Sequence, residues 1–113
     1  MKVFVLKTCQ SCKKALAWLE EQNIAFTAHD VRADGLTRDV VAPIVQSLGW
    51  EKAVNRRSTT WRNLSEADRD RLDADKATTL IVDNPTLMKR PVFVTEQEVM
   101  AGFDNTTKAW LSP

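Results

Sequence analysis

The sequence contains little of what metal centres and secreted scaffolds require. Its 113 residues include one histidine, His29, two cysteines and no tyrosine. A structural zinc site would need two more soft ligands beside the cysteines, so we expect no metal site. Two cysteines three positions apart are also too few for a secreted disulfide framework. In a reducing compartment such a pair is more often catalytic or metal-binding.

The sequence also lacks a charge excess and long apolar runs. Sixteen basic and fifteen acidic side chains give a net charge of +1, which provides no general field for nucleic acid or an anionic membrane. At the N-terminus only four apolar residues separate Lys2 from Lys7, too few for a signal peptide. No run approaches the roughly 18 apolar residues of a transmembrane helix. We expect a cytoplasmic protein with no direct nucleic-acid or membrane partner.

The first thirty residues predict a β-α-β unit. Val3–Leu6 is short, apolar and rich in β-branched residues, as in a buried strand. A helix is expected over Gln10–Gln22, with Leu16 and Leu19 continuing the face that the two cysteines begin. The segment Ile24–His29 alternates like a second strand, with every other residue from its start on one side. The helix between these strands indicates that they are parallel.

The rest of the chain predicts a helical middle and a β-β-α ending. From Thr37 to about Leu87 no convincing strand appears, and helices are expected over 37–48, from 65, and over 75–82. Two strands, at 92–95 and around 99–100, precede a helix over 105–111. The predicted fold class is α/β: one domain, 1–113, with a four-stranded mixed sheet in the order βαβ, helical insertion, ββα. Residues 1–31 and 88–113 would form its core, and about 32–87 the insertion.

Cys9 stands where the first strand passes into the first helix. A thiolate there faces unsatisfied backbone N–H groups and the positive end of the helix dipole, which both favour the charged form. Lys7, Lys13 and Lys14 add positive potential. We therefore predict that Cys9 is a nucleophile in redox or thiol-transfer chemistry. Cys12, one turn along the same face, either resolves a mixed disulfide on Cys9 or packs as a small buried side chain.

Several arginines are candidates for binding an anion, because guanidinium groups bind carboxylates and oxyanions bidentately. Arg90 is the strongest candidate, since Pro91 holds it in an extended conformation just before a predicted strand. One of Arg56 and Arg57 is expected to face the site. For Arg62 a solvated position in a polar loop is the simpler interpretation.

Five segments of the chain carry the motifs of a known family: Cys9–Ala15, Asp34–Leu36, Gly49–Trp50, Asn55–Arg62 and Lys89–Pro91. Together they resemble the ArsC/Spx superfamily of arsenate-reductase-like proteins, and most closely its YffB-like branch. The resemblance runs nearly end to end. It implies a thioredoxin-like fold with a helical insertion, a cytoplasmic location, a reactive Cys9 and a cis-proline at Pro91.

For function, the resemblance implies a thiol reductase without a bound cofactor that uses glutathione as co-substrate and acts on glutathione or a protein disulfide. Arg56, Arg57, Arg90 and Pro91 would then form the substrate or glutathione site beside Cys9 and Cys12. Two alternatives stay open. The C-x-x-C pair also fits a Spx-like regulator that binds RNA polymerase and is switched by a disulfide. An arsenate reductase is the other alternative, although its third arginine would fall near 99–103, where none occurs.

Overall fold

The computed structural model describes residues 1–112 and divides them into two compact units. The first unit consists of Met1–Asp30 together with the chain from Arg90 onwards, and the second is Val31–Lys89. Across the described residues, every helix is too short or too polar to span a lipid bilayer.

The first unit is built on one four-stranded sheet. Its strands are β1 (Lys2–Val5), β2 (Thr27–Asp30), β3 (Val92–Val94) and β4 (Val99–Ala101), arranged in the order β2-β1-β3-β4. The pair β1 and β2 is parallel, whereas β3 runs antiparallel to both β1 and β4. The predicted α/β class with a mixed four-stranded sheet is confirmed.

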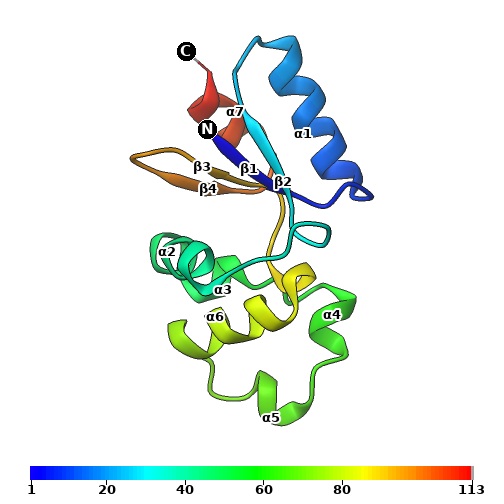
Figure 1. Ribbon diagram of the computed structural model, residues 1–113, viewed down its shortest axis with the longest axis vertical. Helices are drawn as coiled ribbons and strands as arrows, with labels where there is room; N and C mark the ends of the chain where they lie inside the picture. Colours follow the sequence, from blue (N-terminus) through cyan, green and yellow to red (C-terminus); the bar gives the residue numbers. More distant parts are fainter. Residues whose placement is uncertain (113) are drawn as a thin grey trace. The chain divides into compact units, whose positions relative to one another are not determined.

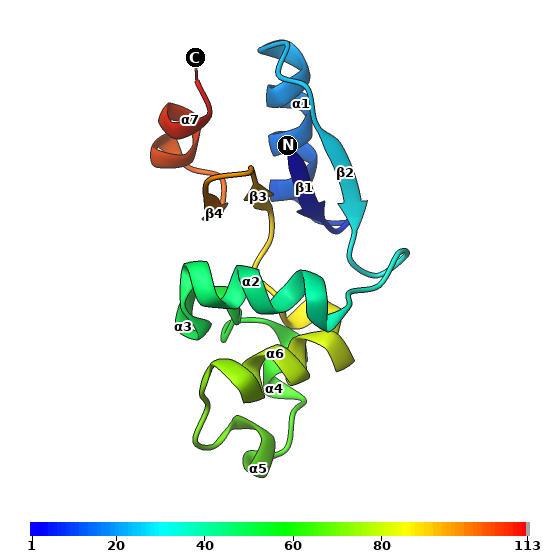
Figure 2. The same cartoon turned by 60° about the vertical axis from the view of Figure 1, so that its left-hand side comes forward.

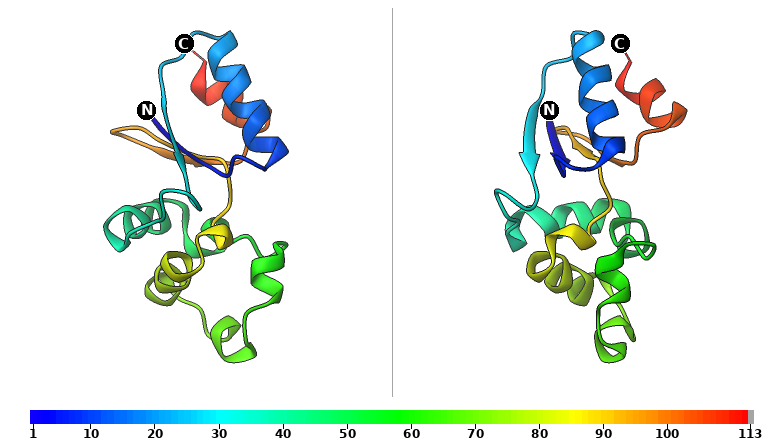
Figure 3. Two further views of the ribbon diagram at one scale, coloured as in Figure 1. Left: turned by 45° about the vertical axis from the view of Figure 1, so that its right-hand side comes forward. Right: turned by 90° about the vertical axis from the view of Figure 1, so that its right-hand side faces the viewer.

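Helices α1 (Gln10–Glu21) and α7 (Asn105–Leu111) cover the same face of this sheet (Figures 1 and 3). The buried cluster between them and the sheet comprises Val3, Val5, Cys12, Ala15, Leu19 and Phe93. The buried positions of α1 recur at three- and four-residue spacing, so one stripe of the helix faces the strands. This stripe begins beside Cys9, as the sequence predicts, and holds the N-terminus of α1 at the end of β1.

The second strand begins later than predicted. Asn23 adopts a left-handed backbone conformation with φ of 56°, and the Ile24 amide donates to the Leu19 carbonyl at 3.0 Å. The end of α1 therefore occupies the first positions of the expected strand, and β2 starts only at Thr27. Ile24 packs on the core from this turn, but Ala28 is exposed. The two residues therefore do not share one side of a strand, because Ile24 lies in the turn that precedes β2.

The second unit is helical (Figure 2). Its elements are α2 (Arg38–Leu48), α3 (Trp50–Ala53), α4 (Thr59–Arg62), α5 (Glu66–Arg69), α6 (Ala74–Asp83) and the 3₁₀ turn η1 (Pro85–Leu87). Helix α2 packs against α3 and α6, and Gly49 ends it with φ of 83°. The helices predicted from 37, 65 and 75 are present. Helices α3 and α4 were not predicted, because a single turn is too short to show a periodic pattern.

Replacing the central aromatic of the first unit tests this packing. Phe93 is fully buried, so Phe93→Ala is expected to lower the free energy of unfolding by about 3–5 kcal/mol through lost apolar burial and a cavity. Urea denaturation measures this change. Lys14→Ala on the exposed side of α1 is the matched control, expected within about 0.5 kcal/mol of the parent. Equal effects of the two substitutions would contradict the assignment of Phe93 to the core.

Candidate active site

Cys9 is the N-cap residue of α1. Its backbone is extended, with φ of −83° and ψ of 124°, and no side-chain oxygen caps the helix. The Cys9 amide donates to the Leu6 carbonyl at 2.9 Å, and its carbonyl accepts the first helical bond from Lys13 at 3.0 Å. The half-buried sulfur thus occupies the position that a capping oxygen usually takes.

The surroundings of Cys9 stabilise its thiolate. Partial burial by itself would raise the pKa of this thiol. Hydrogen bonds from the Cys12 amide, the Cys12 thiol and the Ser11 amide, with the positive charge of Arg90, outweigh that effect and lower the pKa below its ordinary value. Since the thiolate is the nucleophilic form, more of Cys9 is reactive at neutral pH than of a free cysteine.

The pKa of Cys12 is shifted in the opposite direction, upwards. Cys12 is 1% exposed and belongs to the hydrophobic core. The pKa of this thiol is raised to about 11, mainly by burial, with Cys9 also raising it and the Leu6 backbone and the Arg90 charge lowering it. Cys12 is therefore protonated when Cys9 is ionised, and its S–H donates to the Cys9 sulfur. The structure gives Cys12 both a packing position and a direct contact with Cys9.

Arg90 and Pro91 belong to the same unit as the cysteines. The Arg90–Pro91 peptide bond is cis, the isomer that the resemblance implies. The Pro91 carbonyl accepts a hydrogen bond from the Gly102 amide at 2.8 Å, which holds this segment beside the end of β4. The Arg90 charge lowers the pKa of both thiols. Cys9, Cys12 and Arg90 thus form one electrostatically coupled group.

Asp30 stabilises the turn that precedes Cys9 in the chain. It is the last residue of β2, is 6% exposed, and pairs with Val5 at the end of β1. Its carboxylate accepts a hydrogen bond from the Lys7 amide at 2.9 Å, in the two-residue turn before Cys9. The sequence analysis missed this residue, because an acidic residue at the end of a strand has no distinguishing local pattern. Its role depends on the parallel register of β1 and β2.

Arg56 and Arg57 lie in the second unit, where they line a cavity of about 550 Å³. Its other lining residues are Glu51, Lys52, Val54, Asn55 and Lys89. The Arg56 guanidinium lies over the Trp50 ring at 5.7 Å, and the Arg57 amide donates to the Asn55 side chain at 3.1 Å. Both predicted arginines therefore line one cavity within the second unit.

Two lysines of this cavity escaped the sequence analysis. Lys52 and Lys89 are distant in sequence but line the same cavity. The Lys89 amide donates to the Ala53 carbonyl at 2.8 Å, and an antiparallel bridge links Val54 with Met88, so the two segments lie side by side. Four cationic side chains and one carboxylate line the cavity, which favours an anionic ligand. Within the described part of the chain, no group of three or more His, Cys, Asp or Glu side chains could hold a metal ion.

Comparison with known proteins gives consistent results. The profile of the ArsC family matches residues 4–109. An uncharacterized protein of Haemophilus influenzae is 41% identical over 102 residues, 90% of each chain. The global transcriptional regulator Spx of Staphylococcus saprophyticus is 32% identical over 104 residues, 90% of this chain and 79% of Spx. The solved structure of a YffB protein superposes with a TM-score of 0.93 at 33% identity, covering 99% of this chain and 98% of that one.

The electrostatic coupling predicts how the two cysteines react. Cys9 is expected to be alkylated by iodoacetamide with a midpoint pH below that of free cysteine, while Cys12 is unreactive until the pH approaches 11. Arg90→Gln should raise the Cys9 midpoint and slow alkylation at pH 7 about two- to five-fold, whereas Arg90→Lys keeps the charge and most of the rate. Peptide mapping after alkylation at a series of pH values measures both. A midpoint unchanged in Arg90→Gln would contradict the coupling.

Two substitutions at Asp30 test its positioning role. Asp30→Ala removes the acceptor of the Lys7 amide, so the turn loosens, the hydrogen bonds to the Cys9 sulfur weaken, and the pKa of Cys9 rises towards its ordinary value. Asp30→Asn keeps a side-chain oxygen that accepts the same bond, so its alkylation profile should stay close to that of the parent. If both variants shift the Cys9 midpoint equally, loss of the hydrogen bond from the Lys7 amide is not the cause of the shift in the Cys9 pKa.

Proposed function

The chain belongs to the ArsC family, and on that premise we propose that it is a cytoplasmic, glutathione-dependent thiol reductase. The observation that carries this proposal is the Cys9 sulfur at the head of α1, held by backbone and thiol hydrogen bonds that lower its pKa. A stabilised thiolate at a helix N-terminus is a group suited to attack on a disulfide.

The proposed reaction proceeds by thiol–disulfide exchange. The Cys9 thiolate attacks one sulfur of the substrate disulfide, forming a mixed disulfide with Cys9 and releasing the other sulfur as a thiolate. A glutathione thiolate then attacks the mixed disulfide, and the Cys9 thiolate leaves with the electron pair of the broken S–S bond. In a dithiol variant Cys12 loses its proton and attacks the Cys9 sulfur of the mixed disulfide, so that the substrate sulfur leaves as a thiolate and a Cys9–Cys12 disulfide forms. Two glutathione thiols then reduce this disulfide and become glutathione disulfide.

Glutathione carries two carboxylates, and the cationic cavity of the second unit has the charge to bind such groups. Arg56 and Arg57 are its bidentate donors. The contact of Arg56 with the Trp50 ring restricts the Arg56 side chain before a ligand arrives, and the bond from the Arg57 amide to the Asn55 side chain fixes the backbone that carries Arg57. Arg90, next to Lys89 in the chain, would stabilise the leaving or attacking thiolate near Cys9.

A second candidate function is redox-controlled regulation. Two observations support it: Cys9 and Cys12 are one helical turn apart and shift each other's pKa, and the Spx regulator of S. saprophyticus is 32% identical. In this alternative the Cys9–Cys12 disulfide would control binding to RNA polymerase. Arsenate reduction is a weaker candidate, because the chain has no arginine at the position expected for the third oxyanion ligand.

Mass spectrometry after exposure to oxidised glutathione distinguishes these functions. The reductase proposal predicts one glutathione adduct on Cys9, its disappearance in Cys9→Ser, and its retention in Cys12→Ser. With a small disulfide substrate and glutathione, Cys9→Ser should fall to the rate of the uncatalysed exchange, because Cys12 is buried and protonated at neutral pH.

An internal Cys9–Cys12 disulfide without turnover would favour the regulator instead, and a pull-down of RNA polymerase in both redox states would test it. Unmodified cysteines, or full activity of Cys9→Ser, would rule out the proposed reaction. Glu20→Gln, an exposed substitution at the C-terminal end of α1 that leaves both thiols in place, serves as the folding and handling control.

A further inference from the structure

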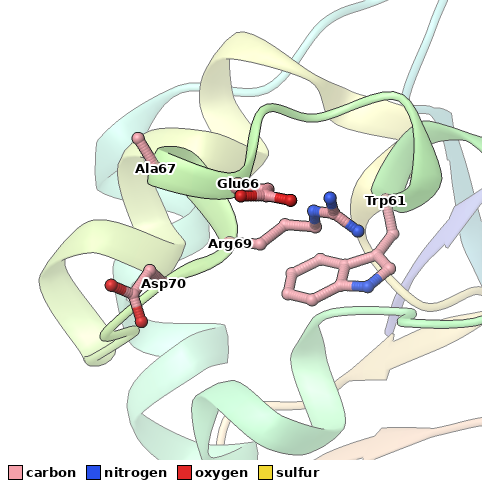
Figure 4. Close-up of a pocket in the computed structure, with 5 residues that line it drawn as sticks. All are labelled: Trp61, Glu66, Ala67, Arg69 and Asp70. Carbon is pink, nitrogen blue, oxygen red and sulfur yellow. The ribbon is translucent and has the colours of Figure 1, made fainter.

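A second cavity lies in the second unit between α4 and α5. Its volume is about 570 Å³, and it is lined by Trp61 of α4 and by Glu66, Ala67, Arg69 and Asp70 of α5 and the residue that follows it. The volume is in the range of small-molecule sites. In Figure 4 the Arg69 side chain extends below the Glu66 carboxylate towards the Trp61 ring. None of these residues takes part in the proposed thiol chemistry.

Both walls of this cavity are fixed by hydrogen bonds to other elements. On one side, the hydroxyl groups of Thr60 and Thr86 are 2.7 Å apart, which ties α4 to η1. On the other side, the Lys76 ammonium donates to the carbonyl of Ala67 at 2.7 Å and to the carbonyl of Asp70, which ties α5 to α6. The cavity is therefore formed before any ligand binds, and a ligand would lose little affinity to ordering it.

Arg69 supplies a donor that the protein itself does not use. Its Nε–H is buried and has no hydrogen-bond acceptor within residues 1–112. A buried donor without an acceptor loses its bond to water without replacement. A ligand carboxylate in the cavity would bind the guanidinium that carries this donor through charge-assisted hydrogen bonds.

The two carboxylates that line the cavity, those of Glu66 and Asp70, favour a ligand that also carries a positive charge. Glu66 is exposed and forms no ion pair in the described part of the chain, while Asp70 lies 3.8 Å from Arg71. Glu66 is therefore the better partner for a ligand ammonium group. Trp61, which is half-buried, adds an apolar ring face. A simple inorganic anion as ligand would be repelled by the Glu66 and Asp70 carboxylates. A hydrocarbon ligand would leave the Arg69 donor without an acceptor.

These groups correspond to the three parts of an α-amino acid. We propose that the cavity between α4 and α5 binds a zwitterionic α-amino acid with an apolar or aromatic side chain. Arg69 binds its carboxylate, Glu66 binds its ammonium group, and its side chain packs on Trp61. This binding is independent of the Cys9 chemistry and stands even where the proposed reductase function fails.

Titration with L-phenylalanine followed by NMR tests the proposal. The chain has four tryptophans, so four indole N–H signals are expected, and Trp61→Phe identifies the one from Trp61. L-phenylalanine should shift that signal saturably. N-acetyl-L-phenylalanine amide, which has the same side chain but neither charge, should bind about ten-fold more weakly or less.

Charge-removing substitutions complete the test. Arg69→Gln and Glu66→Gln should each weaken L-phenylalanine binding about ten-fold, whereas Arg71→Gln, whose side chain is 92% exposed outside the cavity, should leave it unchanged. Because Glu66 is exposed, Glu66→Gln decides the matter if Arg69→Gln does not fold. No saturable shift, an equal affinity for the blocked amide, or no effect of Glu66→Gln would overturn the proposal. Equal affinity would indicate a site for a peptide segment instead.

Discussion

The first turn of α1 has backbone N–H groups that no preceding carbonyl can satisfy, and the rest of the candidate active site depends on this constraint. In most helices a side-chain oxygen accepts one of them. Here Cys9 occupies the N-cap position, and the neighbouring Ser11 and Cys12 amides lower the pKa of its thiol. An ionised sulfur is a better acceptor than a protonated one, so the geometry of the helix end and the acidity of the thiol have a single cause.

The hydrophobic core keeps this arrangement in place. Cys12, Ala15 and Leu19 bury one stripe of α1 against Val3 and Phe93, which prevents the helix from rotating about its axis. The buried stripe begins with Cys12, which explains the difference between the two cysteines. Cys9 is a half-buried thiol with a lowered pKa and Cys12 a buried thiol with a raised pKa, although they are only one helical turn apart.

The second unit differs in character from the first. Its short helices are joined by side-chain bonds such as those of Lys76 and Thr60, and its two cavities carry their charges on loops and single turns. The cavity around Arg56 and Arg57 is strongly cationic, whereas the one around Trp61 contains both signs of charge. Ligands of different chemistry are therefore expected at the two places.

Much of the fold could be predicted from local patterns. The apolar β1, the stripe of α1, the helix ending at Gly49 and the helix over 105–111 are each encoded by periodicity or by a residue with a backbone preference, and these signals act within a few residues. The beginning of β2 and the helices α3 and α4 were not predictable, since Asn23 and Ile24 extend the end of α1 and single turns show no period.

By itself the sequence determined that Cys9 lies at a helix N-terminus, because its strand pattern ends just before this residue and its helix pattern begins just after it. Only the tertiary structure decided that the pKa of Cys12 is raised and that the Lys7 amide donates to Asp30. The same holds for the cavity that Lys52 and Lys89 both line and for the burial of the Arg69 Nε–H. Each of these depends on burial or on pairing between segments distant in the chain. Such relations are set by the packing of the whole unit, and no local pattern of residues encodes them.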